Sequence, residues 1–102
     1  MASRLDLHEE FCNVLGTRNV YYNSPESVKM NYPCIRYNLA GLDTKFANNE
    51  IYNSIKKYEV TVIDKDPDSP IYDDIIRHFP MCRLDRVYVA ANLYHYVITL
   101  YY

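Results

Sequence analysis

The chain has 102 residues, of which 49% are hydrophobic and 24% are charged, so its composition is that of one folded domain rather than a disordered segment. Its net charge of -2 provides no basic footprint for nucleic acid. No apolar run approaches the roughly 20 residues of a membrane helix, and the N-terminus does not resemble a signal peptide. We therefore expect a soluble protein that is made in a cytoplasm and has no membrane partner.

The first forty residues contain one predicted helix and two predicted strands. Apolar residues at helical spacing indicate an amphipathic helix over residues 3–16, and Gly16 suits the left-handed position that ends a helix. Alternating apolar residues predict strands over residues 18–22 and 34–39. In the second of these strands, the side chains expected to face the core are Ile35, Tyr37 and Leu39.

Residues 40–57 have neither a helical nor an alternating hydrophobic period. The segment is too long for a tight turn, and long connections in compact domains are usually functional or mobile. We interpret it as the extended tip of a hairpin that joins two strands. Its apolar side chains are interleaved with polar ones and form no clean face: Phe46, Ile51, Tyr52 and Ile55. Because exposed apolar patches usually mark interaction surfaces, we predict an arm that contacts a partner.

The clearest pattern lies in residues 57–80, where the hydrophobic period changes from two residues to four. Its first part is a predicted half-buried strand with the alternating apolar residues Tyr58, Val60 and Val62. An acidic turn follows, after which Ser69 offers an N-cap oxygen and Pro70 occupies the first helical position. Pro80 ends the helix, whose apolar face consists of Ile71, Ile75 and Phe79. We expect this face to pack against the preceding strand and the last one.

The C-terminal residues predict two more strands, joined by a turn at residues 90–92. The first covers residues 81–84 and 87–89, with an interruption between them. The second, over residues 93–102, is apolar on both faces, and a strand of this kind is covered on both faces. Since the chain has two helices, we expect another subunit to provide the second cover.

The expected fold is therefore α+β, as one domain over residues 1–102. Its element order is αβββαββ, with two helices packed on one face of a mostly antiparallel mixed sheet of about five strands, and with a long β-hairpin arm. The twelve tyrosines fit either a Tyr-rich sheet or a subunit that buries a second face against neighbours. The residues predicted to contact other copies or partners are Phe46, Ile51, Tyr52, Ile55, His95, Val97 and Tyr101.

The acidic turn at residues 64–68 is the nearest approach to a metal motif. Its three aspartates alternate as in the opening of a calcium loop, but that loop needs Gly at its sixth position and Glu at its twelfth. Counted from Asp64, these positions hold Ser69 and Ile75. We expect a solvated turn whose carboxylates favour the positive end of the following helix, and no metal site.

The remaining polar side chains form no catalytic pattern. With two glycines the chain cannot form a Gly-rich phosphate loop, and no Ser, Cys or Lys lies in a nucleophile motif. Asp73 and Asp74 precede Arg77 and His78 by four residues, a spacing typical of ion pairs on an exposed helix face. Three widely separated cysteines are expected to be reduced: Cys12, Cys34 and Cys82. We therefore predict no enzymatic activity and no cofactor.

Four segments, residues 7–16, 32–37, 58–69 and 93–101, resemble the small tail-completion, or tail-terminator, proteins of long-tailed bacteriophages and prophages. The most specific part is Val62-Ile-Asp-Lys-Asp-Pro-Asp68, followed by a helix that ends at His78-Phe-Pro80. The likeness covers nearly the whole chain. It implies an α+β virion protein whose family pattern includes no catalytic residues.

The resemblance also implies a role in head-tail joining during virion assembly. Such a subunit forms a ring, expected to be a hexamer, that caps the head-proximal end of the tail tube. Its partners are other copies of itself, the major tail tube protein and the head-closure, or connector, protein, with DNA only as passing cargo. It can be monomeric before it meets the tail, and it passes from the host cytoplasm into the virion tail.

Two other classes of protein are compatible with the residues. One is a small dimeric binding or regulatory module without catalytic activity, similar to a toxin/antitoxin-like host regulator. The other is a nuclease that uses Asp64, Asp66 and Asp68 with a divalent metal. The mass in solution separates a ring from a fixed dimer, and metal-dependent cleavage of DNA tests the nuclease.

Overall fold

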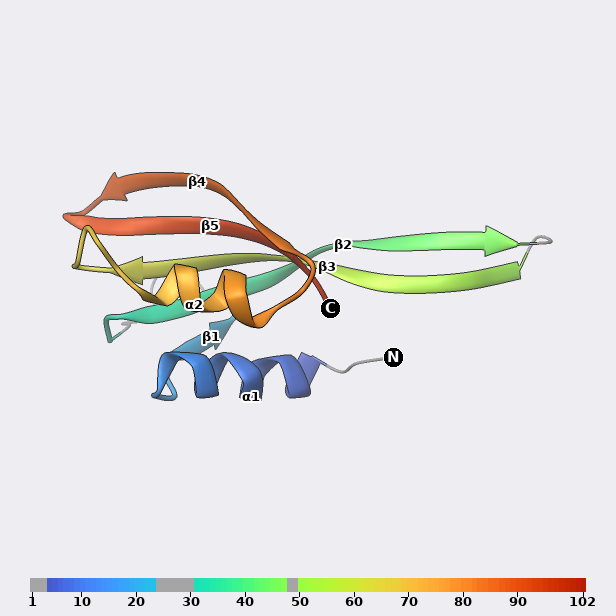
Figure 1. The fold of residues 1–102 in the computed structure, drawn as a ribbon, viewed down its shortest axis with the longest axis horizontal. Helices are drawn as coiled ribbons and strands as arrows, with labels where there is room; N and C mark the ends of the chain where they lie inside the picture. Colours follow the sequence, from blue (N-terminus) through green and yellow to red (C-terminus); the bar gives the residue numbers. More distant parts are fainter. Residues whose placement is uncertain (1–3, 24–30, 48–49) are drawn as a thin grey trace.

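The computed structural model describes residues 4–23, 31–47 and 50–102, with the backbone alone for residues 43–47 and 50–54 (Figure 1). In chain order its elements are α1 (Arg4–Leu15), β1 (Val20–Tyr22), β2 (Cys34–Ala47), β3 (Glu50–Asp64), α2 (Ile71–His78), β4 (Cys82–Ala90) and β5 (Leu93–Tyr101). The strands form one sheet in the order β1-β2-β3-β5-β4, in which β1 and β2 are parallel and all other neighbours antiparallel. The predicted α+β fold and its element order αβββαββ are confirmed.

Both helices pack on one face of this sheet. The strand registers bring apolar residues of β2, β3 and β5 to the same face: Ile35 lies opposite Val62, and Tyr37 and Ile98 flank Val60. These side chains are fully buried. The helices contribute to the same core the buried side chains Leu7, Phe11 and Ile75, and Phe79 follows directly after α2. Full burial of each such apolar side chain stabilises the fold by roughly 1.5–3 kcal/mol.

Aromatic rings join α1 to the end of α2 and to the sheet. The ring of Phe11 lies edge-on to Phe79 with centroids 5.4 Å apart, and edge-on to Tyr37 at 5.0 Å. Pairs of this kind contribute roughly 0.5–1.5 kcal/mol beyond the burial of their area. The predicted burial of the α2 face is therefore confirmed, with Ile71 half-buried at its margin.

The start of α2 lies one residue later than predicted, at Ile71, although the predicted capping contact is present. The hydroxyl of Ser69 accepts a hydrogen bond from the backbone N–H of Ile71 at 3.3 Å. Pro70 has helical dihedral angles, φ −78° and ψ −12°, and its carbonyl accepts a hydrogen bond from the N–H of Asp74 at 3.0 Å. The proline ring therefore presets the direction of the helix.

The two C-terminal strands form a hairpin with one irregularity. Leu84 pairs with Ile98 and Arg86 pairs with Val97, so Asp85 is the extra residue of a β-bulge. This bulge is the physical form of the predicted interruption at residues 85–86. The turn at Ala91 and Asn92 has positive φ at both residues, 52° and 61°, which is the geometry of a two-residue type I′ hairpin.

The expectations for the segment after residue 38 need correction. In the described residues 40–47 and 50–57, β2 and β3 pair as far as Ala47 and Glu50, with register shifts between Leu39 and Gly41 and between Lys45 and Phe46. Leu39 does not face the core, since its side chain is 48% exposed beside a bulge between Leu39 and Gly41. The hydrophobic pattern therefore hid the strand pairing, and the role of this hairpin as an arm stays a prediction.

One predicted ion pair on α2 forms and the other does not. Arg77 Nε lies 2.9 Å from an oxygen of Asp73, as the four-residue spacing predicted. His78 instead bonds Glu10 of α1 through its Nε2. The two helices contact each other, so the α1 carboxylate competes for the last polar side chain of α2 and links the helices.

Candidate assembly surfaces

The hairpin of β2 and β3 extends beyond the rest of the sheet (Figure 1). Its last links to the C-terminal segment are two backbone hydrogen bonds between Lys56 and Tyr102, at 3.0 and 3.3 Å. Beyond them, in the part of the chain that the structure describes, β2 and β3 pair only with each other. This extension gives the molecule a length of 51 Å, against 24 and 23 Å in the other directions.

The hairpin residues predicted to contact a partner are only partly described. Ile55 is half-buried and pairs with Asp43 across the hairpin. Near the root of the hairpin, Leu39 is 48% exposed and Leu42 is 60% exposed. The hairpin root therefore presents apolar surface. The side chains outside the described residues are Phe46, Ile51 and Tyr52.

The other three predicted contact residues lie on the sheet face opposite the helices. Val97 is only 4% exposed, because it lies directly opposite Arg86 of β4 and Thr61 of β3 on its two sides. Its burial therefore needs no second subunit, and its side chain offers little area to a partner. His95 and Tyr101 are half-buried on the same face.

A polar hollow of about 230 Å³ lies beside His95 on this face. The His95 ring stacks on Tyr88 with centroids 4.6 Å apart, and its Nδ1–H donates to the Leu93 carbonyl at 3.1 Å. Groups of both charges line the hollow, so it suits a polar surface or ligand that carries both charges. Its lining residues are Arg36, Asn38, Glu59, Thr61, Ile63, Tyr88 and His95.

The outer edge of β4 is a surface that the sequence analysis missed. β4 ends the sheet, and every residue in it except Cys82 is exposed. Five of the nine exposed large apolar side chains among the described residues lie here: Met81, Leu84, Val87, Tyr88 and Val89. Hydrophobic alternation predicts a strand but does not say whether the strand lies at an edge. The missing signal was the strand order.

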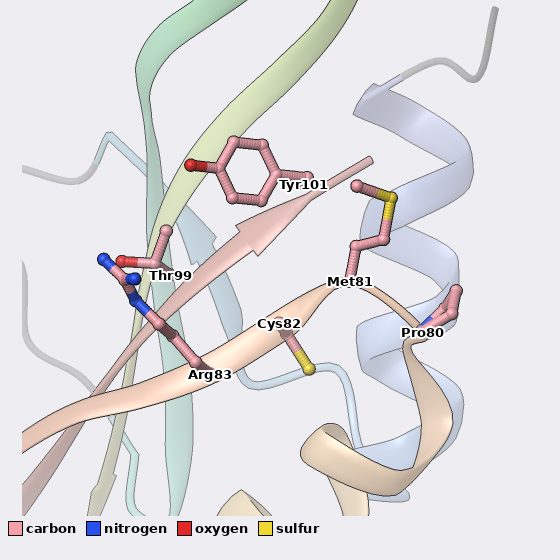
Figure 2. Close-up of a pocket in the computed structure, with 6 residues that line it drawn as sticks. All are labelled: Pro80, Met81, Cys82, Arg83, Thr99 and Tyr101. Carbon is pink, nitrogen blue, oxygen red and sulfur yellow. The ribbon is translucent and has the colours of Figure 1, made fainter.

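A mainly apolar cavity of about 300 Å³ opens at the start of β4 (Figure 2). Figure 2 shows Met81 and Tyr101 on one side of it and Arg83 beside Thr99 on the other. The thiol of Cys82 points to the end of α2, where the Phe79 carbonyl lies 3.3 Å from its Sγ. The lining residues are Pro80, Met81, Cys82, Arg83, Thr99 and Tyr101.

Asp85, the bulge residue, ties β4 to β5 through polar contacts. It accepts a hydrogen bond from the Thr99 hydroxyl, and Arg83 Nε lies 2.9 Å from its other oxygen. The Thr99 hydroxyl and the Arg83 guanidinium hold the pKa of Asp85 below its ordinary value. The carboxylate is thus ionised near neutral pH and fixes the bulge in place.

The thiols are in a form that is unsuited to nucleophilic chemistry. The structure contains them as free cysteines, with no disulfide. Burial raises the pKa of Cys12 and Cys82 and raises that of Cys34 to about 11. Thiols with raised pKa values stay protonated near neutral pH and are weak nucleophiles.

The polar residues of the acidic turn have structural partners. Carboxylate oxygens of Asp64 and Asp66 accept the backbone N–H groups two residues on, at 3.2 and 2.9 Å. The Tyr96 hydroxyl donates to the Pro67 carbonyl at 2.8 Å and fastens the turn to β5. Among the residues that the structure describes, no group of three His, Cys, Asp or Glu side chains could hold a metal ion.

His8 on α1 also has a packing role. Burial and the nearby Arg4 and Arg18 lower the pKa of His8, so the neutral ring is favoured. Its Nδ1 lies 2.8 Å from the Tyr37 hydroxyl, which donates to it. This contact gives a hydrogen-bond partner to the hydroxyl of Tyr37, which is fully buried.

A scan against protein-family models and a search of curated proteins both find no match to this chain. The described residues include no helix that is both long and apolar enough to span a membrane.

Proposed function

We propose that this chain is a structural subunit that assembles into a ring at the head-proximal end of a phage tail tube and joins the tail to the head-closure protein. The observation that carries the proposal is the long β2–β3 hairpin, which leaves the sheet with both of its outer edges unpaired by other described strands. A subunit that needs only its own core has no use for such an extension. The resemblance of four segments to tail-terminator proteins supports the same conclusion.

A ring needs two different surfaces on each subunit. Repeated head-to-tail contacts close into a ring, whereas one self-complementary patch closes at a dimer. The hairpin and the uncovered edge of β4 lie at different places on the fold and can serve as these two surfaces (Figure 1). In this proposal the protein carries out no reaction and holds no cofactor or metal, and DNA passes through the ring.

Electron microscopy of tails that are assembled with and without the protein tests this function. With the protein, we expect a ring density at the head-proximal end of each tail tube and tails that join heads. Without it, the same end should lack the density and the tails should stay separate. Tails that are identical in both preparations contradict the proposal.

A second candidate is a small dimeric binding module, which the polar hollow of about 230 Å³ favours. Its residues of both charges could recognise a polar group on a partner. Native mass spectrometry distinguishes the two candidates, because a module of this kind forms nothing larger than a dimer as its concentration rises. A mass that increases toward a larger closed ring, alone or with tail tubes, supports the first proposal.

A further inference from the structure

The exposed edge of β4 carries apolar side chains that no described strand covers. By register, Leu84, Val87 and Val89 lie on the helix-bearing face, opposite the β5 residues Ile98, Tyr96 and Tyr94. The side chains of these three β4 residues are 40%, 49% and 61% exposed, whereas Ile98 is fully buried. An exposed edge strand is a template for strand addition, which charges and bulges oppose. The charges and the bulge of β4 lie within residues 83–86, and residues 87–90 beyond them are uncharged.

The root of the hairpin is a second open edge in the same chain. On its outer side, β2 pairs with β1 only as far as Tyr37, and β3 pairs with β5 only as far as Lys57. The described residues beyond these points have no third strand beside them. Exposed Leu39 and Leu42 give this edge an apolar character like that of β4.

One chain cannot pair these two edges with each other. In Figure 1, β4 begins near the point where the hairpin leaves the sheet, and the two then run in opposite directions. We propose that the β4 edge of one subunit pairs with the outer edge of the hairpin of a second copy, which adds a strand to the sheet. This inference rests on the proposed ring, because a head-to-tail contact of this kind links each copy to the next.

The cavity at the start of β4 gives the incoming hairpin an anchor point. The cavity is mainly apolar, has a volume of about 300 Å³ and opens beside the exposed Met81 (Figure 2). Apolar side chains that enter such cavities commonly dominate the binding energy of an interface.

Pairing between two copies of β4 accounts for fewer of these features. A two-fold β4 pair covers the apolar edge, but it closes after two chains and leaves both hairpins without a partner. A hairpin from another copy covers the same edge and leaves each copy free to link to the next, so the hairpin is the better occupant.

Cross-linking of cysteine variants of the full chain tests the pairing. Leu42→Cys places a thiol at the hairpin root and Val87→Cys places one on the β4 edge, both at exposed positions. With a short bis-maleimide, the double variant should give a ladder of covalent multimers, while each single variant should match the parent chain. The parent controls for reaction at the native cysteines.

Each other outcome of this experiment overturns the inference. A covalent dimer from Val87→Cys alone means that two β4 strands pair, and a dimer from Leu42→Cys alone means that two hairpins pair. A double variant that gives no multimers, either alone or with tail tubes present, shows that the two edges do not meet. A parent protein that caps tails in any of these cases keeps the proposed function and loses only this interface, whereas failure to cap tails removes the function itself.

A charge placed on the edge provides a second readout. Val87→Lys should abolish the multimers because a lysine on an edge strand blocks strand addition. Its melting temperature should stay within about 4 °C of the parent, since the position is exposed. Leu5→Lys, at an exposed position on α1, is the matched control and should assemble like the parent. Normal multimers from Val87→Lys contradict the inference.

Discussion

The two strands of the C-terminal hairpin both carry alternating apolar residues but have opposite environments, and β4 also carries the charged residues Arg83, Asp85 and Arg86. In β5 the residues from Tyr96 to Leu100 are buried, whereas in β4 every residue after Cys82 is exposed. The difference comes from position, because β5 lies between β3 and β4 while β4 ends the sheet. Apolar sequence in this chain therefore serves two purposes: it forms a core where strands and helices surround it, and it remains available for contacts at the edge.

The first test of this comparison removes a side chain from the core. Phe79→Ala removes a ring that is 4% exposed and packed on Phe11, and it should cost about 3–5 kcal/mol of unfolding free energy. Chemical denaturation measures this loss. Leu5→Ala, at an exposed position of α1, should stay within about 0.5 kcal/mol of the parent. Equal losses in the two variants would mean that Phe79 is not part of the core.

The second test compares valine-to-alanine substitutions on the neighbouring strands β5 and β4. Val97→Ala on β5 removes a buried side chain and should cost roughly 1.5–3 kcal/mol. Val87→Ala on β4 removes an exposed one and should change the unfolding free energy by less than about 0.5 kcal/mol. Denaturation of the monomeric proteins decides the point. A Val87→Ala variant that is as unstable as Val97→Ala would show that the edge is covered within one chain.

Local sequence patterns predicted much of the core, but they did not predict which strand lies at the edge of the sheet. The strand from Tyr58 to Val62 and the α2 face follow from local periodicity, and their burial is confirmed. Residues 65–68 of the acidic turn are exposed, as the turn residues predicted. The left-handed Gly16, with φ 81°, follows in the same way. What local patterns do not encode is which strands become neighbours, so the open edge of β4 and the burial of Val97 within a single chain were not predicted.

The β2–β3 hairpin also shows that local sequence patterns do not predict every pair of strands. Its polar and apolar residues are mixed in the sequence, and hydrophobic periodicity is a signal of a buried face. Strand pairing there depends on backbone hydrogen bonds, which leave no pattern in the side chains. Leu39 was assigned to the core because it continues an alternation that a bulge then breaks.

A smaller effect is expected at the Asp85 bulge, which lies in β4 beside β5. Thr99→Val removes the hydroxyl that donates to Asp85, so the pKa of Asp85 should rise toward its ordinary value. A lowered pKa stabilises the folded state above the ordinary value, and this stabilisation is lost as the pH falls through the pKa of the folded protein. Carboxyl NMR titration measures the change. Thr61→Val is the control, and an unchanged Asp85 pKa in Thr99→Val would contradict the assigned contact.

The smallest expected effect is in the reactivity of the buried and half-buried thiols, Cys34 and Cys82. Because burial raises the pKa of Cys34 to about 11, Cys34 should remain unmodified by iodoacetamide at pH 8 in the folded protein. Cys82, which is half-buried, should react before it. Peptide mass spectrometry reports the order, with the denatured chain as the control. Early modification of Cys34 would show that this part of the core opens readily.

The most direct test of the account is the assembly mass of a folded chain without its hairpin. Residues 43–53 are replaced by a short Gly-Ser bridge, and native mass spectrometry is recorded on a sample whose melting temperature is known. We expect the melting temperature to stay within about 4 °C of the parent, because the described residues of this segment pair only within the β2–β3 hairpin. The shortened chain should remain monomeric where the parent forms rings. A shortened chain that unfolds, or one that folds and still assembles, contradicts the division between a self-sufficient core and an assembly hairpin.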